Sequence, residues 1–276
     1  GCSSCGVCGP ELGHNVVVPP PPIPPQLPQR PPASERLQRL RFRFSKTDAL
    51  VLLSHLDLVR LLERALRRSG LPVSFTGGFH PLPRVQFGLA LPLGVEATGE
   101  WMDVEFAQPL VAEAARTALQ RQLPAGFVLQ SVAEVPVAAP SLSQEIVASR
   151  WALTLQPDQG KVQVKAPLPS PEAWQRAAAA LLEAETWIWH DTDKKGRARQ
   201  RDCRPFLQQL QVLALDGPAP ITLHYQALVD PTGRSLRPEQ LQHWFATWLD
   251  CPLELVALRR VALHLAATRD QPNQPC

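Results

Sequence analysis

Alternating polar and apolar positions predict a strand at residues 37–44, in the segment RLQRLRFRF. Leucine and phenylalanine fall on one side of this strand and arginine on the other, because successive side chains of a strand point to opposite faces. We expect the apolar side to join a core and the arginine side to form a basic outer face.

The pattern changes to a helical period after Ser54. Ser54 and Asp57 have the spacing of a capping box, and Asp57 also suits the positive end of a helix. The apolar positions of this predicted helix repeat at three and four residues: Leu58, Leu61, Leu62, Ala65 and Leu66. Its other side is strongly basic: Arg60, Arg64, Arg67 and Arg68. Gly70 is expected to end the helix.

The rest of the chain predicts short strands and helices in an order that nearly repeats. In the first half, strands are expected at 72–75, 86–93, 101–106 and 126–135, with a helix at 111–122. In the second half, strands are expected at 146–155 and 161–166 as a hairpin, then at 186–193, 221–229 and 253–265. Helices are expected at 171–184 and 237–249, while residues 200–215 fit either type. This order predicts an α+β fold of two tandem ferredoxin-like (split βαβ) units, residues 36–136 and 144–266.

Composition limits the classes of function. With 45% hydrophobic residues the chain can bury a sizeable core, and a formal net charge of +3 leaves nucleic-acid binding to local basic patches. No apolar run reaches the roughly 20 residues that span a bilayer, so we expect a soluble, cytoplasmic protein without a membrane partner. GxxxxGK[ST], GxGxxG and GxSxG motifs do not occur, which argues against P-loop hydrolases, Rossmann enzymes and esterases.

The first residues carry candidate metal ligands. Cys2, Cys5 and Cys8 are close enough for a tight turn to bring their thiolates to one zinc ion or iron–sulfur cluster. A fourth ligand would come from upstream, from His14 or from outside the chain; free or disulfide-forming cysteines are the alternative. We expect residues 1–18 to be the end of a preceding module, 19–35 a proline-rich linker and 267–276 a disordered tail. Cys203, Cys251 and Cys276 are expected to be ordinary thiols, and the body is expected to hold no cofactor.

Four polar residues form a candidate site in the first half. His55 and Asp57 at the predicted helix N-terminus could face the loop with His80 and Arg84, and together bind an anion or perform acid–base chemistry. A structural role competes with this interpretation, because capping alone explains Asp57 and loop bracing explains His80.

A second basic segment, KKGRARQRDCR, lies in the second half. Alternate arginines on a strand would form one row of charges, and with the basic helix they suggest contact with an RNA backbone. The candidate phosphate-binding residues are Arg60, Arg64, Arg67, Lys194, Lys195, Arg197 and Arg199. A solvated hairpin tip is the alternative. Trp187, Trp189, Trp244 and Trp248 have the spacing of core pairs, which disfavours base stacking.

Several segments taken in order resemble one bacterial family. They are FSK at 44–46, SHLDL at 54–58, GGFHP at 77–81, FGLALPLG at 87–94 and the Asp202, Arg204 and Pro205 positions. They are similar to the radical-SAM-linked domain of unknown function, which occurs alone or fused behind a B12-binding radical S-adenosylmethionine (SAM) module. GCSSCGVCG is similar to the end of that module, and with Gly1 as first residue we expect the back part of a longer polypeptide.

The resemblance implies an accessory role. It suggests a substrate-recognition domain of a radical SAM system, partnered with the B12-binding module in cis or in trans and acting on RNA or a ribosome component. No SAM cleavage is expected from this chain alone. Two alternatives remain at this point: a ferredoxin-like RNA-processing enzyme using His55 and His80, and a partner-docking domain without its own ligand.

Overall fold

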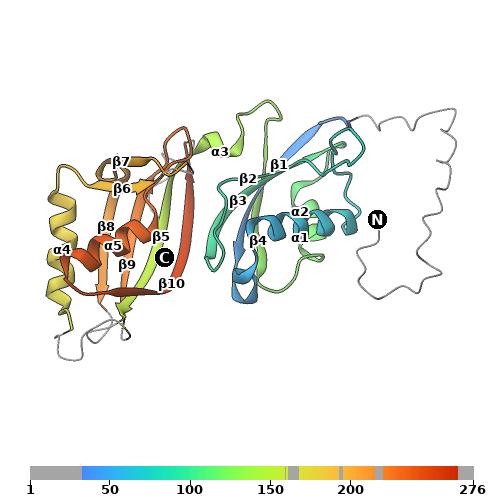
Figure 1. The fold of residues 1–276 in the computed structure, drawn as a ribbon. Coiled ribbons are helices and arrows are strands. Elements are labelled where there is room, and N and C mark those ends of the chain that lie inside the picture. Colours follow the sequence, from blue (N-terminus) through green and yellow to red (C-terminus); the bar gives the residue numbers. More distant parts are fainter. Residues whose placement is uncertain (1–32, 159, 161–167, 193–194, 215–219, 267–276) are drawn as a thin grey trace, which may run out of the picture.

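The computed structural model describes residues 33–158, 160, 168–192, 195–214 and 220–266. Over these residues the chain forms one eight-stranded mixed sheet, a separate two-stranded hairpin and helices, which confirms the α+β class. Figure 1 shows two halves side by side, each with a pair of helices. The cysteine cluster, the proline-rich segment, the predicted strand at 161–166, Lys194 and the tail lie outside the described residues.

The first half contains four strands and two helices. They are β1 (Gln38–Lys46), α1 (His55–Arg68), β2 (Val85–Phe87), β3 (Glu96–Phe106), α2 (Ala112–Gln120) and β4 (Phe127–Val135). The strands lie in the order β4-β1-β3-β2, and each neighbouring pair is antiparallel. A 3-10 helix, η2 (Asp48–Leu52), connects β1 to α1.

The second half repeats the arrangement. It consists of β5 (Ile146–Pro157), α4 (Pro171–Glu183), β8 (Leu207–Ala214), β9 (Ile221–Leu228), α5 (Pro238–Trp248) and β10 (Leu253–Leu265). Its strand order, β10-β5-β9-β8, is again antiparallel throughout. The hairpin of β6 (Ile188–Thr192) and β7 (Ala198–Asp202), followed by η3 (Arg204–Phe206), stands between α4 and β8.

A short parallel pairing of β3 with β10 joins the two halves into one sheet. Only two residue pairs make it, Arg259 with Glu96 and Arg260 with Ala97. Gly99 lies just beyond, where a Cβ atom would be 2.6 Å from the backbone oxygen of Val261. Glycine is therefore needed at this position for the two strands to approach.

Each half has its own apolar core. In the first, Leu58, Leu62, Ala65 and Leu66 of α1 pack on strand residues such as Phe42 and Met102. In the second, the buried residues include Trp151, Trp174, Tyr225 and Phe245. Trp187 and Trp244 contact each other edge to face at 5.5 Å within this core, as their predicted core role requires.

The arginine side of β1 does not form a basic outer face; that prediction is wrong. Arg39 and Arg41 are 2% and 6% exposed, and both donate to the carboxylate of Asp103 on β3. Arg39 also donates to the carbonyl oxygens of Ala139 and Pro140, and Arg41 pairs with Glu145. The segment leading into α3 (Leu142–Glu145) thus covers this side of the first half, and we call these paired charges the rear charge network.

Some predicted strands take other forms. Residues 72–75 contribute only isolated bridges at Val73 and Phe75, and the strand expected at 86–93 ends at Phe87. Pro92 and the positive φ of Gly94 break the extended pattern there. Among the described residues β5 pairs with β9 and β10, while its expected hairpin partner at 161–166 lies outside that part of the chain. The ambiguous segment 200–215 divides among β7, η3 and β8.

Candidate functional site

The N-terminus of α1 is capped as the sequence predicts. The Ser54 hydroxyl accepts from the Asp57 backbone N–H at 3.3 Å and donates to the Asp57 carboxylate at 2.6 Å. The hydrogen bond from Ser54, with the charge of Arg60, lowers the pKa of Asp57. Asp57 is therefore an ionised carboxylate near neutral pH that holds the Ser54 cap, consistent with its structural interpretation.

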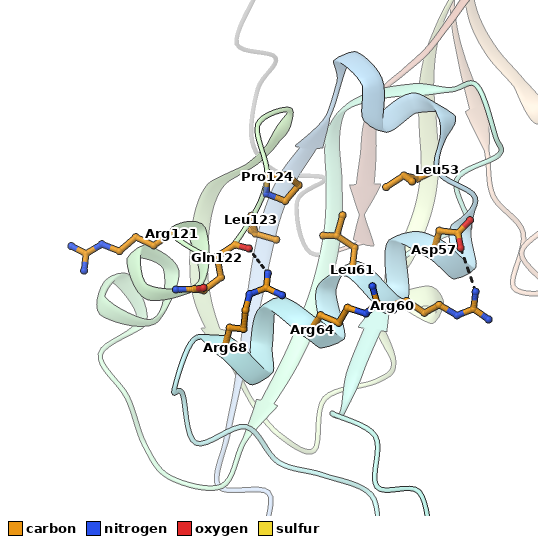
Figure 2. Close-up of a pocket in the computed structure, with 10 residues that line it drawn as sticks. All are labelled: Leu53, Asp57, Arg60, Leu61, Arg64, Arg68, Arg121, Gln122, Leu123 and Pro124. Atoms are coloured by element: carbon orange, nitrogen blue, oxygen red, sulfur yellow. Dashed lines mark hydrogen bonds and ion pairs between the residues drawn. The ribbon is translucent and has the colours of Figure 1, made fainter.

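A groove about 650 Å³ in volume runs along the outer side of α1. Its apolar lining comes from Leu53, Leu61, Leu123 and Pro124, and its polar lining includes Asp57, Arg60, Arg64, Arg68, Arg121 and Gln122. We call it the α1 groove. Figure 2 shows Arg64 and Arg68 along it, with Arg60 and Arg121 extending outward at its ends.

Three arginines of the α1 groove, Arg60, Arg64 and Arg68, are spaced four residues apart on α1, so they share one helix face at intervals of about 6 Å. The fourth, Arg121, follows α2. All four are exposed. Arg60 makes a 3.3 Å ion pair with Asp57, and Arg68 donates to the backbone oxygen of Gln122. Four guanidiniums and one carboxylate therefore line an apolar groove, an arrangement that favours anions.

Arg67 lies outside this groove. Its guanidinium donates to the Pro81 backbone oxygen at 3.0 Å and lies 5.1 Å from the ring centre of Phe75. The exposed His80 therefore belongs to a loop that contacts the C-terminal end of α1. His55 is at the other end of the same helix, about 18 Å from Arg67 along the helix axis.

Arg84 is on the other side of the sheet from His55. Val85 and Phe87 pack into the core under α1, so the alternation of strand side chains turns Arg84 and Gln86 toward the opposite face. The Arg84 backbone oxygen accepts from Glu105, a residue of that rear face. The structure therefore does not bring His55, Asp57, His80 and Arg84 into one site.

His55 lies instead beside a cluster of buried charges. Its ring contacts Phe87 edge to face at 5.4 Å, and its pKa is lowered by burial and by the charges of Arg260 and Lys46. Lys46 is fully buried and donates to the backbone oxygen of Leu53 at 3.3 Å. Burial lowers the pKa of Lys46.

Arg260 and Glu100 complete this cluster and join the two halves. Two nitrogens of Arg260 on β10 donate to the two carboxylate oxygens of Glu100 on β3, at 2.6 and 2.7 Å. Both side chains are 3% exposed. Arg260 also donates to the backbone oxygens of Leu89 and Ala90. Two of the segments that resemble the bacterial family therefore lie at this junction. FSK contributes Lys46, and FGLALPLG contributes the backbone oxygens of Leu89 and Ala90.

Acidification from neutral pH is expected to destabilise the protein through its histidines. Burial and neighbouring cationic side chains lower the pKa values of His55, His224 and His264 below the ordinary 6.5. The unfolded chain therefore binds more protons below that value, so the free energy of unfolding falls as pH drops. Urea unfolding at about pH 7.5 and about pH 5.5 measures this difference.

His55→Gln should reduce that pH dependence, and His80→Gln, at an exposed position, is the matched control. An equal free energy of unfolding at the two pH values would contradict the prediction. Carboxylates with lowered pKa values, such as Asp57 and Asp230, lose their contribution only at more acidic pH. The stability that they provide is lost only when the pH drops below their pKa in the unfolded chain, which is near 4.

The second predicted basic segment forms the exposed β6–β7 hairpin. Lys195, Arg197 and Arg199 are all exposed on it. Arg199 and Arg201 lie on one face of β7, and Arg201 is the register partner of Trp189 on β6. These residues belong to the second half and the α1 arginines to the first, so the two basic groups lie on different halves of the protein (Figure 1).

A second pocket, about 570 Å³ in volume, was not anticipated from the sequence. Its lining comes from five segments: 89–92, β5, the hairpin, residues 233–240 and β10. Its aromatic and charged residues are Trp151, Trp189, Arg201, Arg234, Arg237, Glu239 and Arg260. We call it the arginine–tryptophan pocket. Trp189 and Arg201 come together in it only through the register of the hairpin.

The described cysteines behave as expected for structural thiols. Cys203 is 1% exposed, and burial raises its pKa. Cys251 is 8% exposed, and burial raises its pKa as well. Among the described residues no group of three or more potential ligands could hold a metal ion. Cys2, Cys5 and Cys8 lie outside that part of the chain.

The fold and the two hollows define a mixed α+β protein with two arginine-lined hollows, and no described helix is both long and apolar enough to cross a bilayer. The model of a family described as an uncharacterized protein conserved in bacteria (DUF2344) matches residues 39–238. The chain belongs to this family. No curated protein matches significantly.

A crystal structure of a Cbf5-Nop10-Gar1 complex is similar over 81% of this chain, at 12% identity and a TM-score of 0.46. The similarity covers 48% of that chain, so this protein spans about half of its length.

Proposed function

We propose that this protein is an accessory domain that recognises RNA for a radical SAM system. The observation that carries the RNA part is the α1 groove, where four exposed arginines and one carboxylate surround an apolar floor. Arginine pairs well with phosphate oxygens, and phosphate contacts supply most of the sequence-independent affinity for nucleic acid. The exposed Lys195, Arg197 and Arg199 of the hairpin provide a further contact region.

The partner and the unit architecture are parts of the same proposal. The motifs shared with the radical-SAM-linked domain support a B12-binding radical SAM module as partner, in cis or in trans. Each half has the order strand, helix, strand, strand, helix, strand when the added hairpin is set aside, and its strands lie 4-1-3-2. These two features support two ferredoxin-like units. Cys2, Cys5 and Cys8 are proposed to hold zinc or an iron–sulfur cluster, which metal analysis of the purified full chain addresses.

RNA binding is expected to weaken with salt and to depend on the α1 groove. Replacing both Arg60 and Arg64 with glutamine should reduce the magnitude of the negative slope of log K against log salt by about 1.4. Each phosphate contact on a single strand contributes about 0.7 to that magnitude. Filter binding of a single-stranded RNA over a series of salt concentrations measures this slope.

Arg67→Gln is the matched control for this experiment. Arg67 is an exposed arginine on the same helix, but it contacts Pro81 and lies away from the groove. The slope of R67Q should equal that of the parent protein. RNA binding that is absent, or that does not respond to salt, would remove the proposal.

Acid–base cleavage by His55 and His80 is not part of the proposal. The two histidines lie near opposite ends of α1, so they cannot act on one phosphodiester in this conformation.

A further inference from the structure

We propose that the arginine–tryptophan pocket binds a nucleoside monophosphate unit, with its base on Trp189 and its phosphate on Arg201, Arg234 and Arg237. This inference deepens the proposed function, because an unpaired nucleotide of a bound RNA can supply that unit. A free nucleotide presents the same chemistry.

Trp189 supplies the aromatic surface. It is half-buried, and its ring contacts His243 edge to face at 5.2 Å, which fixes its orientation. Trp151 is 6% exposed and held more firmly, since its Nε1 donates to Ser149 Oγ and the Arg260 guanidinium lies 5.4 Å from its ring centre. Stacking on a ring is how proteins commonly bind unpaired bases.

Three arginines provide the site for the phosphate. Arg201 stands beside Trp189 in the hairpin register, and its Nε atom is buried without a hydrogen-bond partner among the described residues. A buried donor without a partner costs free energy, which an acceptor from a ligand would recover. Arg234 and Arg237 are exposed members of the lining, on the segment just before α5.

The charge balance of the pocket favours an anion. Arg260 is neutralised by Glu100, so Arg201, Arg234 and Arg237 stand against Glu239 among the charged lining residues. The N-terminus of α5, which is eleven residues long, also contributes to the lining through Pro238, Glu239 and Gln240. A helix N-terminus adds partial positive charge and further favours a phosphate.

The dimensions and shape fit a single unit rather than a duplex. The volume of about 570 Å³ lies within the range of pockets that enclose small molecules. An unpaired nucleotide combines a planar base with a phosphate, and the lining offers the Trp189 side chain and three arginines for these two parts. Paired bases have their faces stacked on neighbours and cannot present them to Trp189.

Titration calorimetry with the full chain tests the proposal, using AMP, GMP, CMP and UMP, with ribose 5-phosphate as a baseless probe. Trp189→Leu should weaken binding of at least one nucleotide by about tenfold or more, because stacking on an aromatic side chain contributes that much. Trp248→Leu is the matched control, since Trp248 is 40% exposed on the same protein half and is not in the lining.

The contribution of the arginines is tested with Arg201→Gln, and Arg176→Gln on the exposed side of α4 is the control. Arg237→Gln, at an exposed position, keeps the test valid if R201Q does not fold. We expect R201Q and R237Q to weaken binding of nucleotide and of ribose 5-phosphate, and R176Q to leave both unchanged. No binding of any nucleotide at millimolar concentration, or equal binding by the W189L and W248L variants, overturns the proposal.

A single-stranded RNA then identifies the source of the unit. If W189L weakens binding of both the RNA and the mononucleotide, the pocket takes a nucleotide of the RNA. If only mononucleotide binding is lost, it takes a free nucleotide. Salt-dependent RNA binding that responds to the Arg60 and Arg64 replacements, while no variant of the pocket has any effect, refutes this inference and leaves the proposed function intact.

Discussion

Replacement of Asp103 with asparagine should lower the free energy of unfolding by about 3–5 kcal/mol, the usual effect of removing one partner from a buried ion pair. The Asp103 side chain is 1% exposed and accepts from both Arg39 and Arg41, whose side chains are 2% and 7% exposed. Asparagine removes the negative charge, which leaves Arg39 without a carboxylate and Arg41 with Glu145 alone. Urea unfolding followed by circular dichroism measures the loss.

Glu113→Gln is the control for this experiment. It breaks an ion pair with Arg116 in which the Glu113 side chain is 63% exposed. Exposed pairs contribute at most about 1 kcal/mol, so this variant should be much more stable than D103N. If D103N lost no more stability than E113Q, the rear charge network would have no stabilising role.

Replacement of Glu100 with glutamine should have an effect of similar size, about 3–5 kcal/mol, at the junction of the two halves. It leaves Arg260 without its carboxylate and Lys46 without the charge that raises its pKa against the effect of burial. The measurement is again urea unfolding, now compared between about pH 7 and about pH 9.5.

The pH comparison isolates the contribution of Lys46. With Glu100 neutralised, the pKa of buried Lys46 falls further below the ordinary 10.5, so the unfolded chain binds more protons in the alkaline range. Stability of E100Q should therefore rise with pH, and its deficit relative to the parent protein should shrink. Adding Lys46→Met should abolish this recovery; recovery of equal size in the double variant would contradict the assignment.

The sequence predicted best the features that depend on neighbouring residues. Ser54 caps α1 as expected, because the N-cap and the backbone N–H of Asp57 lie within one turn. The reciprocal hydrogen bond of a full capping box is absent, since the Asp57 carboxylate accepts from the Ser54 hydroxyl instead. Four of the five predicted apolar positions of α1 are buried, Leu58, Leu62, Ala65 and Leu66, and its arginines are exposed, because a helical period also depends on neighbouring residues. The fifth, Leu61, is half-buried and lines the groove. The α+β class also followed from local periodicity.

The errors concern contacts between distant segments. Arg39 and Arg41 alternate as in a solvent-facing strand, yet Asp103 and Glu145, more than 60 positions away, neutralise them and allow their burial. The acids of the segment WMDVEF signal this only once the register of β1 with β3 is known. The position of His80 also depends on a distant contact. Its loop is held at the C-terminal end of α1, because Arg67 donates to the backbone oxygen of Pro81, and it therefore lies away from His55.

The arginine–tryptophan pocket could not be derived from a motif. Its lining is drawn from five segments between Leu89 and Arg260, and none of them carries a spacing that indicates a ligand. Trp189 was interpreted as a core residue because it alternates with Trp187. Trp187 is 6% exposed within the core, while the half-buried Trp189 packs against the same core and also lines the pocket.

The segment between the two halves determines how the protein can be dissected. Ala139, Pro140 and Glu145 accept from Arg39 and Arg41, so these residues complete the first half although they precede the second. A fragment that stops at residue 136 would keep both guanidiniums and lose three of their acceptors. A first half that is expressed or cleaved separately must therefore extend to the end of α3. Even then it would lose the ion pair between Glu100 and Arg260, because Arg260 belongs to the second half.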